Sequence, residues 1–448
     1  MSLNIVIESY GCTANRNDSE LIAGLLEKKG CNVIFGNASK IGGDIVILNG
    51  CIVKGPTLKR MERRLYDILK TNKKVIITGC FSFYKERIAK IVKKIENEGK
   101  RSYVSVTRDI KEIPKIILSF ENKTKLERIK EISPRKPTVI KVGIEKKKLN
   151  SIIGINQICT GCTGKCTFCA TRLVKGYVKS YPIAAIVKSI SQDVKEGCKE
   201  ILLTATDLGC YGLDDGGYKL IDLLNSINEI KGKFLVRLGM INPGHLINFI
   251  DEFVECCKSE KFFKFLHLPL ESGNDEVLKE MNRDYKVKDF LKIVKKFRKN
   301  FPDSVIATDI ITGFYNENES AFKDTIRVIR EIKPDILHIS RFWPMPKTPA
   351  YEKMRGMNRN EVKLILDMAK KRAKILHDLH KKIALEKNKK FIGKEVLCLI
   401  ENKGYDKTLL ARDINYRLVG IKSENKKFML GQFYKIKIKD AKSNFLIA

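Results

Sequence analysis

The stretch Cys162-Thr-Gly-Lys-Cys166-Thr-Phe-Cys169 carries three cysteines within eight residues. Thiolates hold the four iron corners of a [4Fe–4S] cluster. A loop that supplies three thiolates therefore leaves one iron open for another ligand. The loop follows a strand-like run that begins near Ile155. This order predicts an α/β barrel with the cysteines at the carboxyl ends of its strands, the face that carries barrel chemistry.

Cys159 precedes these three cysteines and gives the pattern Cys-x2-Cys-x3-Cys-x2-Cys. A four-cysteine zinc site is one alternative, although zinc motifs usually separate two Cys-x2-Cys pairs by a dozen or more residues. A closed ferredoxin-like cluster is another, although its run is Cys-x2-Cys-x2-Cys. The spacing favours the open cluster on three cysteines.

Composition and charge narrow the class of protein. The chain has 448 residues, of which 43% are hydrophobic, so it is long enough for two or three globular domains. Lys and Arg number 86 against 52 Asp and Glu, a formal net charge of +34. A solvated basic surface is the simplest interpretation, but so large an excess favours a nucleic acid partner.

The sequence also indicates the cellular compartment in which the protein is expected. We expect no membrane span and no signal peptide, because no apolar run is long enough and the N-terminus lacks a basic segment before an apolar core. A cytoplasmic location follows as an expectation. Thirteen cysteines in a reducing compartment indicate metal or redox chemistry rather than a disulfide scaffold.

Residues 1–119 alternate strand and helix patterns and predict a parallel sheet. The expected strands are Leu3–Glu8, Asp44–Leu48 and Val75–Thr78. The expected helices are Asp18–Lys29, with Asp18 or Ser19 as N-cap, and Thr57–Thr71. Residues 120–150 are rich in Lys and Arg, contain Pro134 and Pro137, and are interpreted as a linker.

A Gly-Cys pair follows each of the three expected strands: Gly11-Cys12, Gly50-Cys51 and Gly79-Cys80. Ligands gather at the carboxyl ends of parallel strands in open α/β sheets. Each glycine would let the backbone turn sharply beside a bulky group. Three unrelated buried thiols are the alternative, but the repetition favours a second metal cluster on Cys12, Cys51 and Cys80.

Residues 151–385 contain six strand-like runs separated by helices, which predicts a partial (β/α)6 barrel rather than eight closed strands. The runs begin near Ile155, Ile201, Phe234, Phe265, Val305 and Ile336. The expected helices are Ile183–Glu196, Tyr218–Ile230, His245–Cys257, Val287–Lys299, Glu319–Glu331 and Asn358–Leu385.

Residues 386–448 change to short alternating strands with glycine turns, which predicts a small antiparallel barrel. From 385 to 448 there are 15 Lys and Arg against 7 Asp and Glu, so the local charge is 15 − 7 = +8. A basic barrel with exposed aromatic rings suits RNA contact by charge and stacking. The candidate rings are Tyr405, Tyr416, Phe428 and Tyr434, although some will belong to the barrel core.

Taken together, these motifs resemble the radical S-adenosylmethionine (SAM) methylthiotransferases over nearly the whole chain. The opening motif is Tyr10–Glu20, and Asn49–Val53 and Gly79-Cys80 match its two later cysteine motifs. Gly161–Cys169 resembles the radical SAM motif. The similar barrel motifs are Glu200–Asp207, Arg237–Pro243, His267–Gly273, Thr308–Phe314 and Ile339–Pro349. The C-terminal barrel resembles a TRAM domain, an RNA-binding module.

The resemblance implies two [4Fe–4S] clusters, one on Cys162, Cys166 and Cys169 and one on Cys12, Cys51 and Cys80. It also implies SAM as methyl donor and radical source, tRNA as substrate, and an electron donor and a sulfur source that the sequence does not identify. The expected product is a methylthio group at C2 of an adenosine. The fold class is then α/β, with an N-terminal parallel-sheet domain (1–119), a radical SAM core (151–385) and a TRAM-like barrel (386–448).

The stretch Cys169–Pro182 is similar to the branch that acts on N6-threonylcarbamoyladenosine beside the anticodon. Isopentenyladenosine in tRNA and a ribosomal-protein aspartate are the alternative substrates. A non-catalytic, zinc-stapled RNA-binding protein is the alternative outside the enzymes. For contacts with SAM we expect polar groups at strand ends, although salt bridges and helix caps explain such residues equally well. The candidates are Asp207, Arg237, Glu271 and Asp309.

Four positions depart from the family pattern. Cys159 stands where Asn is expected, and Glu271 where Gln is usual. Met345 and Lys347 replace an expected Arg and Gly. These departures concern the contacts with SAM and substrate rather than the class of reaction.

Overall fold

The computed structural model describes residues 3–52, 55–101, 103–121, 129–131, 140–214, 216, 219–422 and 428–448. The chain divides into two compact units. The first comprises residues 1–149, 160–162 and 169–181, and the second comprises residues 150–159, 163–168 and 182–448.

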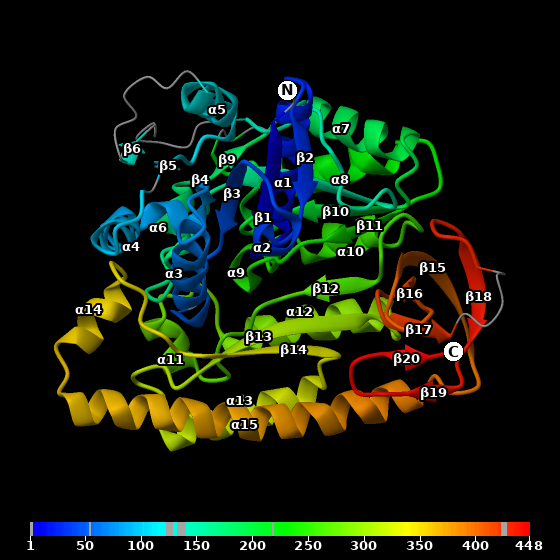
Figure 1. Ribbon diagram of the computed structural model, residues 1–448. Helices are drawn as coiled ribbons and strands as arrows, with labels where there is room; N and C mark the ends of the chain where they lie inside the picture. The colour runs from blue at the N-terminus through cyan, green and yellow to red at the C-terminus, as the bar shows by residue number, and fades with distance from the viewer. Residues whose placement is uncertain are drawn as a thin grey trace. The chain divides into compact units, whose positions relative to one another are not determined.

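The first unit is built on a parallel sheet whose strand order is β2-β1-β3-β4-β5-β6. Figure 1 shows these strands in blue and cyan. The strands are β1 (Asn4–Ser9), β2 (Asn32–Phe35), β3 (Ile45–Gly50), β4 (Lys74–Gly79), β5 (Tyr103–Val106) and β6 (Ile129–Glu131). All six residues of β3 are buried. Its run of Ile, Val and Leu suits a strand that is covered on both faces.

Helices connect and cover these strands. They are α1 (Thr13–Glu27), α2 (Ala38–Ile41), α3 (Gly55–Leu69), α4 (Lys85–Asn97) and α5 (Ile113–Glu121), with the 3-10 turns η1 (Cys80–Phe83) and η2 (Ile110–Glu112). Helix α3 buries Leu58, Met61, Leu65 and Ile68, which recur at helical spacing. The core of the unit packs α1 and α5 against β1 and β3.

Two expectations for this unit need correction. Helix α1 begins five residues before Asp18, and its N-cap is Cys12. Asp18 is therefore a buried residue inside the helix rather than its cap. Within the range expected to be a linker, Ile129–Glu131 form strand β6, and the backbone N–H of Lys147 donates to the Glu20 carbonyl at 3.0 Å. Pro134 and Pro137 lie outside the described residues.

The second unit contains two three-stranded parallel sheets, β7-β10-β11 and β12-β13-β14. A parallel bridge from Val236 to Phe262 lies between them. The strands are β7 (Ile153–Gln157), β10 (Glu200–Thr204), β11 (Leu235–Leu238), β12 (Phe265–His267), β13 (Val305–Thr312) and β14 (Ile336–Arg341). They confirm the expected partial barrel of six βα units.

The expected helices of the barrel are also present, with one division. They are α7 (Ile183–Lys195), α8 (Leu220–Asn228), α12 (Val287–Asn300), α13 (Glu319–Ile332) and α15 (Arg359–Lys389). The range expected as a single helix from His245 to Cys257 is split into α9 (Pro243–Leu246) and α10 (Ile250–Cys257).

The remaining elements of the chain before the C-terminal sheet are short. The helices are α6 (Thr171–Lys175) of the first unit, and α11 (Asp275–Glu280) and α14 (Pro349–Arg355) of the second, with the 3-10 turn η3 (Leu208–Cys210). The strands are β8 (Cys159–Thr160) and β9 (Lys179–Ser180).

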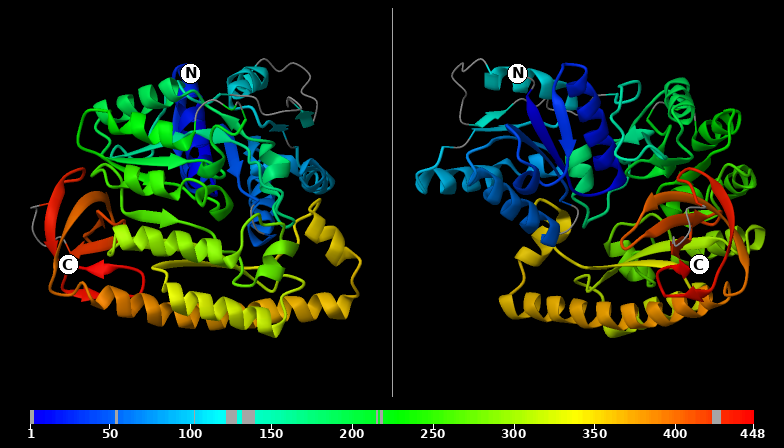
Figure 2. Two further views of the ribbon diagram at one scale, coloured as in Figure 1. Left: turned by 180° about the vertical axis from the view of Figure 1, so that it is seen from behind. Right: turned by 45° about the vertical axis from the view of Figure 1, so that its right-hand side comes forward.

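The C-terminal strands form a mostly antiparallel sheet with the order β18-β15-β16-β17-β20-β19. They are β15 (Glu395–Lys403), β16 (Thr408–Asp413), β17 (Leu418–Lys422), β18 (Phe433–Lys437), β19 (Asp440–Ala441) and β20 (Leu446–Ile447). Helix α15 packs along β13 and β14 and reaches β19, as both views in Figure 2 show. Among the described residues no helix is long and apolar enough to cross a membrane.

Candidate metal centres

Cys12, Cys51 and Cys80 each come shortly after one of three adjacent strands, β1, β3 and β4. The register of the sheet aligns the ends of these strands, with Ser9 opposite Asn49 and Gly50 opposite Gly79. The three thiols therefore emerge along one edge of the sheet. Cys51 and Cys80 are buried, and Cys12 is exposed.

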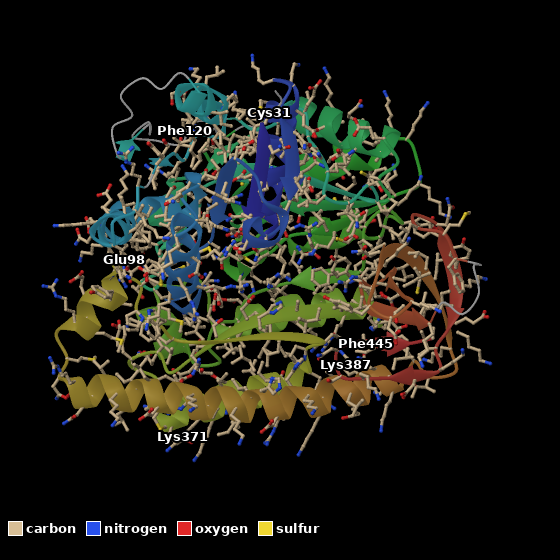
Figure 3. All side chains as sticks on the ribbon, in the orientation of Figure 1. Cys31, Glu98, Phe120, Lys371, Lys387 and Phe445 are labelled. Carbon is tan, nitrogen blue, oxygen red and sulfur yellow. The ribbon has the colours of Figure 1, made fainter. Side chains whose placement is uncertain are left out.

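Electrostatics agree that the three thiols lie close together. Burial raises the pKa of the Cys80 thiol to about 11, against the opposing positive charge of Lys175, while Cys51 and Cys12 add to the rise. Cys31, by contrast, stands before β2, at the amino end of the sheet (Figure 3). The structure thus separates it from the other three.

Glycine is required beside these thiols. Gly11 has φ +123°, and a Cβ there would lie 2.5 Å from Cys51 Cβ and 3.0 Å from its Sγ. Gly79 has φ +72°, and a Cβ there would lie 2.2 Å from Asn49 Oδ1. Both the backbone angle and the close approach exclude a larger residue. This agrees with the sharp turns predicted at Gly11 and Gly79, whereas Gly50 has no positive φ.

Two asparagines fix the loops that carry the thiols. Asn15 Nδ2 donates to the carbonyls of Tyr10 at 3.0 Å and Gly50 at 3.3 Å. Asn49 Nδ2 donates to the Asn15 carbonyl at 2.7 Å and to Ser19 Oγ at 2.9 Å. These bonds tie the start of α1 to the end of β3. The sequence alone did not indicate this role, since an Asn near a strand end has many ordinary uses.

A group of buried charges adjoins the thiols. Asp18 Oδ1 is 2.6 Å from Lys141 Nζ, and Asp18 Oδ2 is 3.9 Å from Lys175 Nζ. Burial alone would lower the pKa of Lys175, but Cys80, Asp18 and the other two thiols together raise it. Burial lowers the pKa of Lys141, although Asp18 opposes that effect. Lys175 lies within the stretch Cys169–Pro182, whereas no motif marks Lys141, which lies 123 residues from Asp18 in the chain.

These surroundings fit an anionic iron–sulfur cluster on Cys12, Cys51 and Cys80. Three thiols are the donors that such a cluster takes. Two ammonium groups whose side chains are 11% and 14% exposed share a single carboxylate, and charge this far from solvent is normally paired. An anionic group beside them would complete the balance. Three protein donors also leave the fourth position open.

The second set of thiols lies on the loop Cys162–Cys169, whose residues divide between the two compact units. In the first unit the backbone N–H of Cys162 donates to the Gly176 carbonyl at 3.2 Å, and Cys169 precedes α6. In the second unit Arg283 Nη1 donates to Cys166 Sγ at 3.3 Å. All three cysteines are half-buried. The short length of the loop limits how far the thiols can separate.

Arg283 favours a thiolate at Cys166. Burial alone would lower the pKa of its guanidinium, but Tyr285 and Cys166 raise it. Its Nη2 donates to Asn242 Oδ1 at 3.0 Å, which fixes the plane of the group. Hydrogen bonds to cluster sulfurs are one of the means by which proteins tune iron–sulfur centres. Arg283 is a functional candidate that no sequence motif revealed.

Two of the four predicted SAM contacts prove to be engaged with the protein. Asp207 is buried and accepts from the backbone N–H groups of Gly209 at 2.9 Å and Asn242 at 3.1 Å. It also lies 2.9 Å from His245 Nδ1. Arg237 packs over the ring of Tyr416, with 5.6 Å to the centroid, and burial lowers its pKa. A contact of either residue with SAM stays a prediction.

The other two predicted contacts lie in or beside strand β13. Glu271 has φ +62°, and its backbone bridges to Ile310 of β13. Asp309 Oδ2 is 2.6 Å from His267 Nε2. The ring of His338 lies 5.5 Å from that of His267. A contact of Glu271 or Asp309 with SAM likewise stays a prediction.

Of the four positions that depart from the family pattern, the structure shows the local environment of Cys159 and the backbone conformation of Lys347. Cys159 is fully buried, and its thiol faces the Asp207 carbonyl at 3.9 Å. Lys347 has φ +70°, a region that favours the glycine expected there.

The aromatic residues of the C-terminal sheet fall into two groups. Tyr405 is 95% exposed and is available for stacking. Tyr416 packs against Phe263 and Phe265 of the barrel, both with centroid distances of 4.9 Å. Phe428 and Tyr434 pack edge to face against each other and lie against the core of the sheet. Tyr416 therefore joins the two parts of the second unit, which corrects its proposed place among the RNA contacts.

Comparison with known families divides the chain in three. Residues 4–98 match the description "Uncharacterized protein family UPF0004". Residues 156–329 match the radical SAM superfamily, and residues 389–448 match the TRAM domain.

Comparison with curated proteins finds relatives of nearly the same length. A probable threonylcarbamoyladenosine tRNA methylthiotransferase of Pyrococcus abyssi is 37% identical, over 99% of each chain. The threonylcarbamoyladenosine tRNA methylthiotransferase MtaB of Thermotoga maritima is 32% identical, over 99% of this chain and 96% of its own. Among solved structures, the radical SAM methyltransferase TsrM of Kitasatospora setae with cobalamin and a [4Fe–4S] cluster has a TM-score of 0.57 at 14% identity. It covers 78% of this chain and 77% of its own, a likeness of fold alone.

Proposed function

We propose that this chain, which belongs to the radical SAM methylthiotransferase family, adds a methylthio group to C2 of N6-threonylcarbamoyladenosine beside the anticodon of tRNA. The full-length relatives carry that activity in their names. The radical SAM and TRAM matches supply the two parts that the reaction needs, radical generation and RNA binding.

One observation carries the proposal: three cysteines follow the aligned ends of the adjacent strands β1, β3 and β4, in addition to the three cysteines of the Cys162–Cys169 loop. A simple radical SAM enzyme needs only the second set. The first set provides a separate place for the sulfur that is to be transferred.

The two sets of thiols have different tasks. Cys162, Cys166 and Cys169 would hold the cluster that binds SAM, and Cys12, Cys51 and Cys80 would hold the other. When bound, these groups supply reductive SAM cleavage and the sulfur for transfer. Arg283 stabilises the Cys166 thiolate, and Gly11 and Gly79 let the backbone pass close to Cys51 and Asn49.

RNA binding falls to the C-terminal strands and to the basic surface. The net charge of +34 favours the phosphate backbone, and the exposed Tyr405 offers a stacking surface. We propose the parts 1–119, 151–385 and 386–448 as the sulfur-donor, radical and RNA-binding regions. The enzyme would act in the cytoplasm with an external electron donor and a sulfur source.

The test combines metal analysis with nucleoside analysis. Protein purified without oxygen should contain about eight iron atoms per chain, the sum of two [4Fe–4S] clusters. Mass spectrometry should find 2-methylthio-N6-threonylcarbamoyladenosine in tRNA incubated with protein, SAM and dithionite. Zinc in place of iron would instead identify a metal-stapled RNA-binding protein.

Matched cysteine variants show which set of cysteines is needed for SAM cleavage and which is needed for methylthiolation. Cys51→Ala should keep SAM cleavage and lose methylthiolation, whereas Cys162→Ala should lose both. Cys31→Ala, at the opposite end of the sheet, should keep both. Product on isopentenyladenosine or on a ribosomal protein, with none on threonylcarbamoyladenosine, would contradict the proposed substrate.

A further inference from the structure

A small cavity lies at the end of β4, against the residue that precedes Cys80, wholly within the first unit. Its volume is about 30 Å³. The residues that line it are Asp18, Gly79, Arg108, Lys141, Thr160, Val174 and Lys175. Gly79 is the residue before Cys80, so the cavity opens at the carboxyl end of β4. The elements that meet there are α1, β4 and α6, brought together from distant parts of the sequence.

The charge in this cavity is positive. Lys141 and Lys175 point at one carboxylate, Asp18, at 2.6 and 3.9 Å. Arg108 also lines the cavity, and its Nη1 donates to the Val174 carbonyl at 3.2 Å. Three cationic side chains against one carboxylate leave an excess of positive charge. Excess buried charge is costly unless an opposite charge joins it.

The volume of the cavity and the charge of its lining together indicate which ligand it would bind. A volume of about 30 Å³ suits a group little larger than one water molecule. The cations select an anion, and the neighbouring thiols place it beside sulfur chemistry. Hydrosulfide has the charge and the size required.

We propose that Lys141 and Lys175 form a hydrosulfide site that adjoins the Cys12, Cys51 and Cys80 centre, and that they are positioning residues for the sulfur used in methylthiolation. This inference rests on the proposed function, because it presupposes a cluster with an open position on those thiols. Lys175 is the last residue of α6, the helix that follows Cys169 in the chain. Lys141 comes from the segment before β7, so the two lysines reach Asp18 from separate parts of the sequence.

The test measures hydrosulfide binding in a protein that cannot catalyse methylthiolation. A Cys162→Ala background removes the SAM cluster, so that the remaining cluster alone gives an electron paramagnetic resonance signal after reduction. Sodium hydrosulfide is titrated into this protein and into versions that also carry Lys175→Met, Lys141→Met, Lys175→Arg or Lys147→Met. Lys147 serves as the control, because it pairs with Glu27 rather than with Asp18.

We expect each of the Lys175→Met and Lys141→Met changes to weaken hydrosulfide binding by about tenfold, the usual effect of one charge-assisted contact. Lys175→Arg should retain most of the affinity, and Lys147→Met all of it. Iron analysis accompanies every titration, with about four iron atoms per chain expected in this background.

The remaining outcomes overturn the proposal in distinguishable ways. Equal affinity in all variants, with iron present, would overturn the hydrosulfide site and leave the proposed function intact. Loss of iron from both methionine variants but not from Lys175→Arg would show that the lysines hold the cluster itself. Absence of iron from the Cys162→Ala background would overturn the proposed function together with the site.

Discussion

Arg283 shows what a single side chain contributes at the Cys162–Cys169 loop. Its guanidinium donates to Cys166 Sγ at 3.3 Å and to Asn242 Oδ1 at 3.0 Å. Hydrogen bonds to charged groups contribute about 1.5–3 kcal/mol. We therefore expect Arg283→Met to speed the loss of iron from this loop to a chelator by roughly tenfold or more, as measured by absorbance under anaerobic conditions.

Arg327→Met is the matched control, because Arg327 forms an exposed ion pair with Asp324 on the surface. That variant should lose iron at the original rate. Equal rates for the Arg283 and Arg327 variants would show that the bond to Cys166 does not stabilise the cluster.

The buried Glu401 should make stability depend on pH. Burial raises the pKa of its carboxyl, and the neighbouring Glu200 adds to the rise against the opposing charge of Arg412. The folded protein therefore keeps a proton on Glu401 that the unfolded chain releases above pH 4.5. The free energy of unfolding should fall as pH rises above about 4.5.

Glu401→Gln removes that dependence, since an amide does not titrate. Its thermal unfolding midpoint should lie above that of the original protein at pH 8, and the difference should shrink towards pH 5. Glu395→Gln, an exposed change on the same strand, should show no such trend. A constant difference across this range would contradict the assignment.

Some of these residues could be predicted from the sequence and others could not. The six cysteines proposed to hold clusters could be selected from their short spacings and from the repeated Gly-Cys pairs. Arg283 and Lys141 reach their partners Cys166 and Asp18 only through folding, over sequence separations of 117 and 123 residues. No local pattern marks them.

At the scale of elements, the turn that begins the Cys162 loop is the most constrained. Gly161 has φ +75°, and a Cβ there would lie 2.1 Å from the Tyr177 carbonyl oxygen. Gly176 has a similar angle, φ +79°, but a Cβ there would meet nothing within 4 Å. Substitutions at the two positions therefore distinguish the effect of backbone strain, which both would carry, from that of a steric collision, which only Gly161 would carry.

We expect Gly161→Ala to displace the loop and reduce iron from about eight to about four atoms per chain. Gly176→Ala carries only the cost of a backbone conformation that is essentially confined to glycine, about 1–3 kcal/mol, and should keep both clusters. Anaerobic iron analysis of the two variants decides the matter. Full iron in Gly161→Ala would mean that the loop tolerates the collision.

Helices and strands could be predicted from the sequence where a regular spacing of apolar residues marks them. Six barrel strands and the long helix α15 match the expected ranges because their apolar spacing is regular. Strands β2, β5 and β6 were missed, since four or fewer residues give little periodicity. Helix α1 starts earlier than expected because Cys12 provides an extended N-cap without a side-chain hydrogen bond, a start that the usual capping residues do not signal.

At the scale of the whole molecule, the charge excess predicts how tRNA binding responds to salt. Each phosphate neutralised by Lys or Arg releases counterions, so affinity falls steeply with ionic strength. We expect the dissociation constant for tRNA to rise about a thousandfold or more between roughly 50 and 200 mM salt, if about six or more phosphates are contacted. Filter binding with full-length protein measures this slope, and a dissociation constant that is insensitive to salt would contradict the phosphate contacts.

Tyr405→Ala tests the non-ionic share of the same interaction. Loss of one stacked base contact costs about 1–3 kcal/mol and should lower affinity without changing the salt slope. A variant that alters the slope but not the affinity at low salt would assign Tyr405 no stacking role. The overall charge was evident from composition, but the exposure of Tyr405 and the packing of Tyr416 were not.

Helix α15 has a mechanical consequence. Its 31 residues form one continuous rod of about 46 Å, from Arg359 to Lys389. Lys387, near its end, lies 2.7 Å from Asp335, while Lys371 in its middle faces outward (Figure 3). Because Tyr416 also packs the terminal sheet directly onto the barrel, the length of the helix must match the distance between these two contacts. Inserting or deleting one helical turn would bring the two attachments into conflict, and we expect such a variant to unfold at a lower temperature.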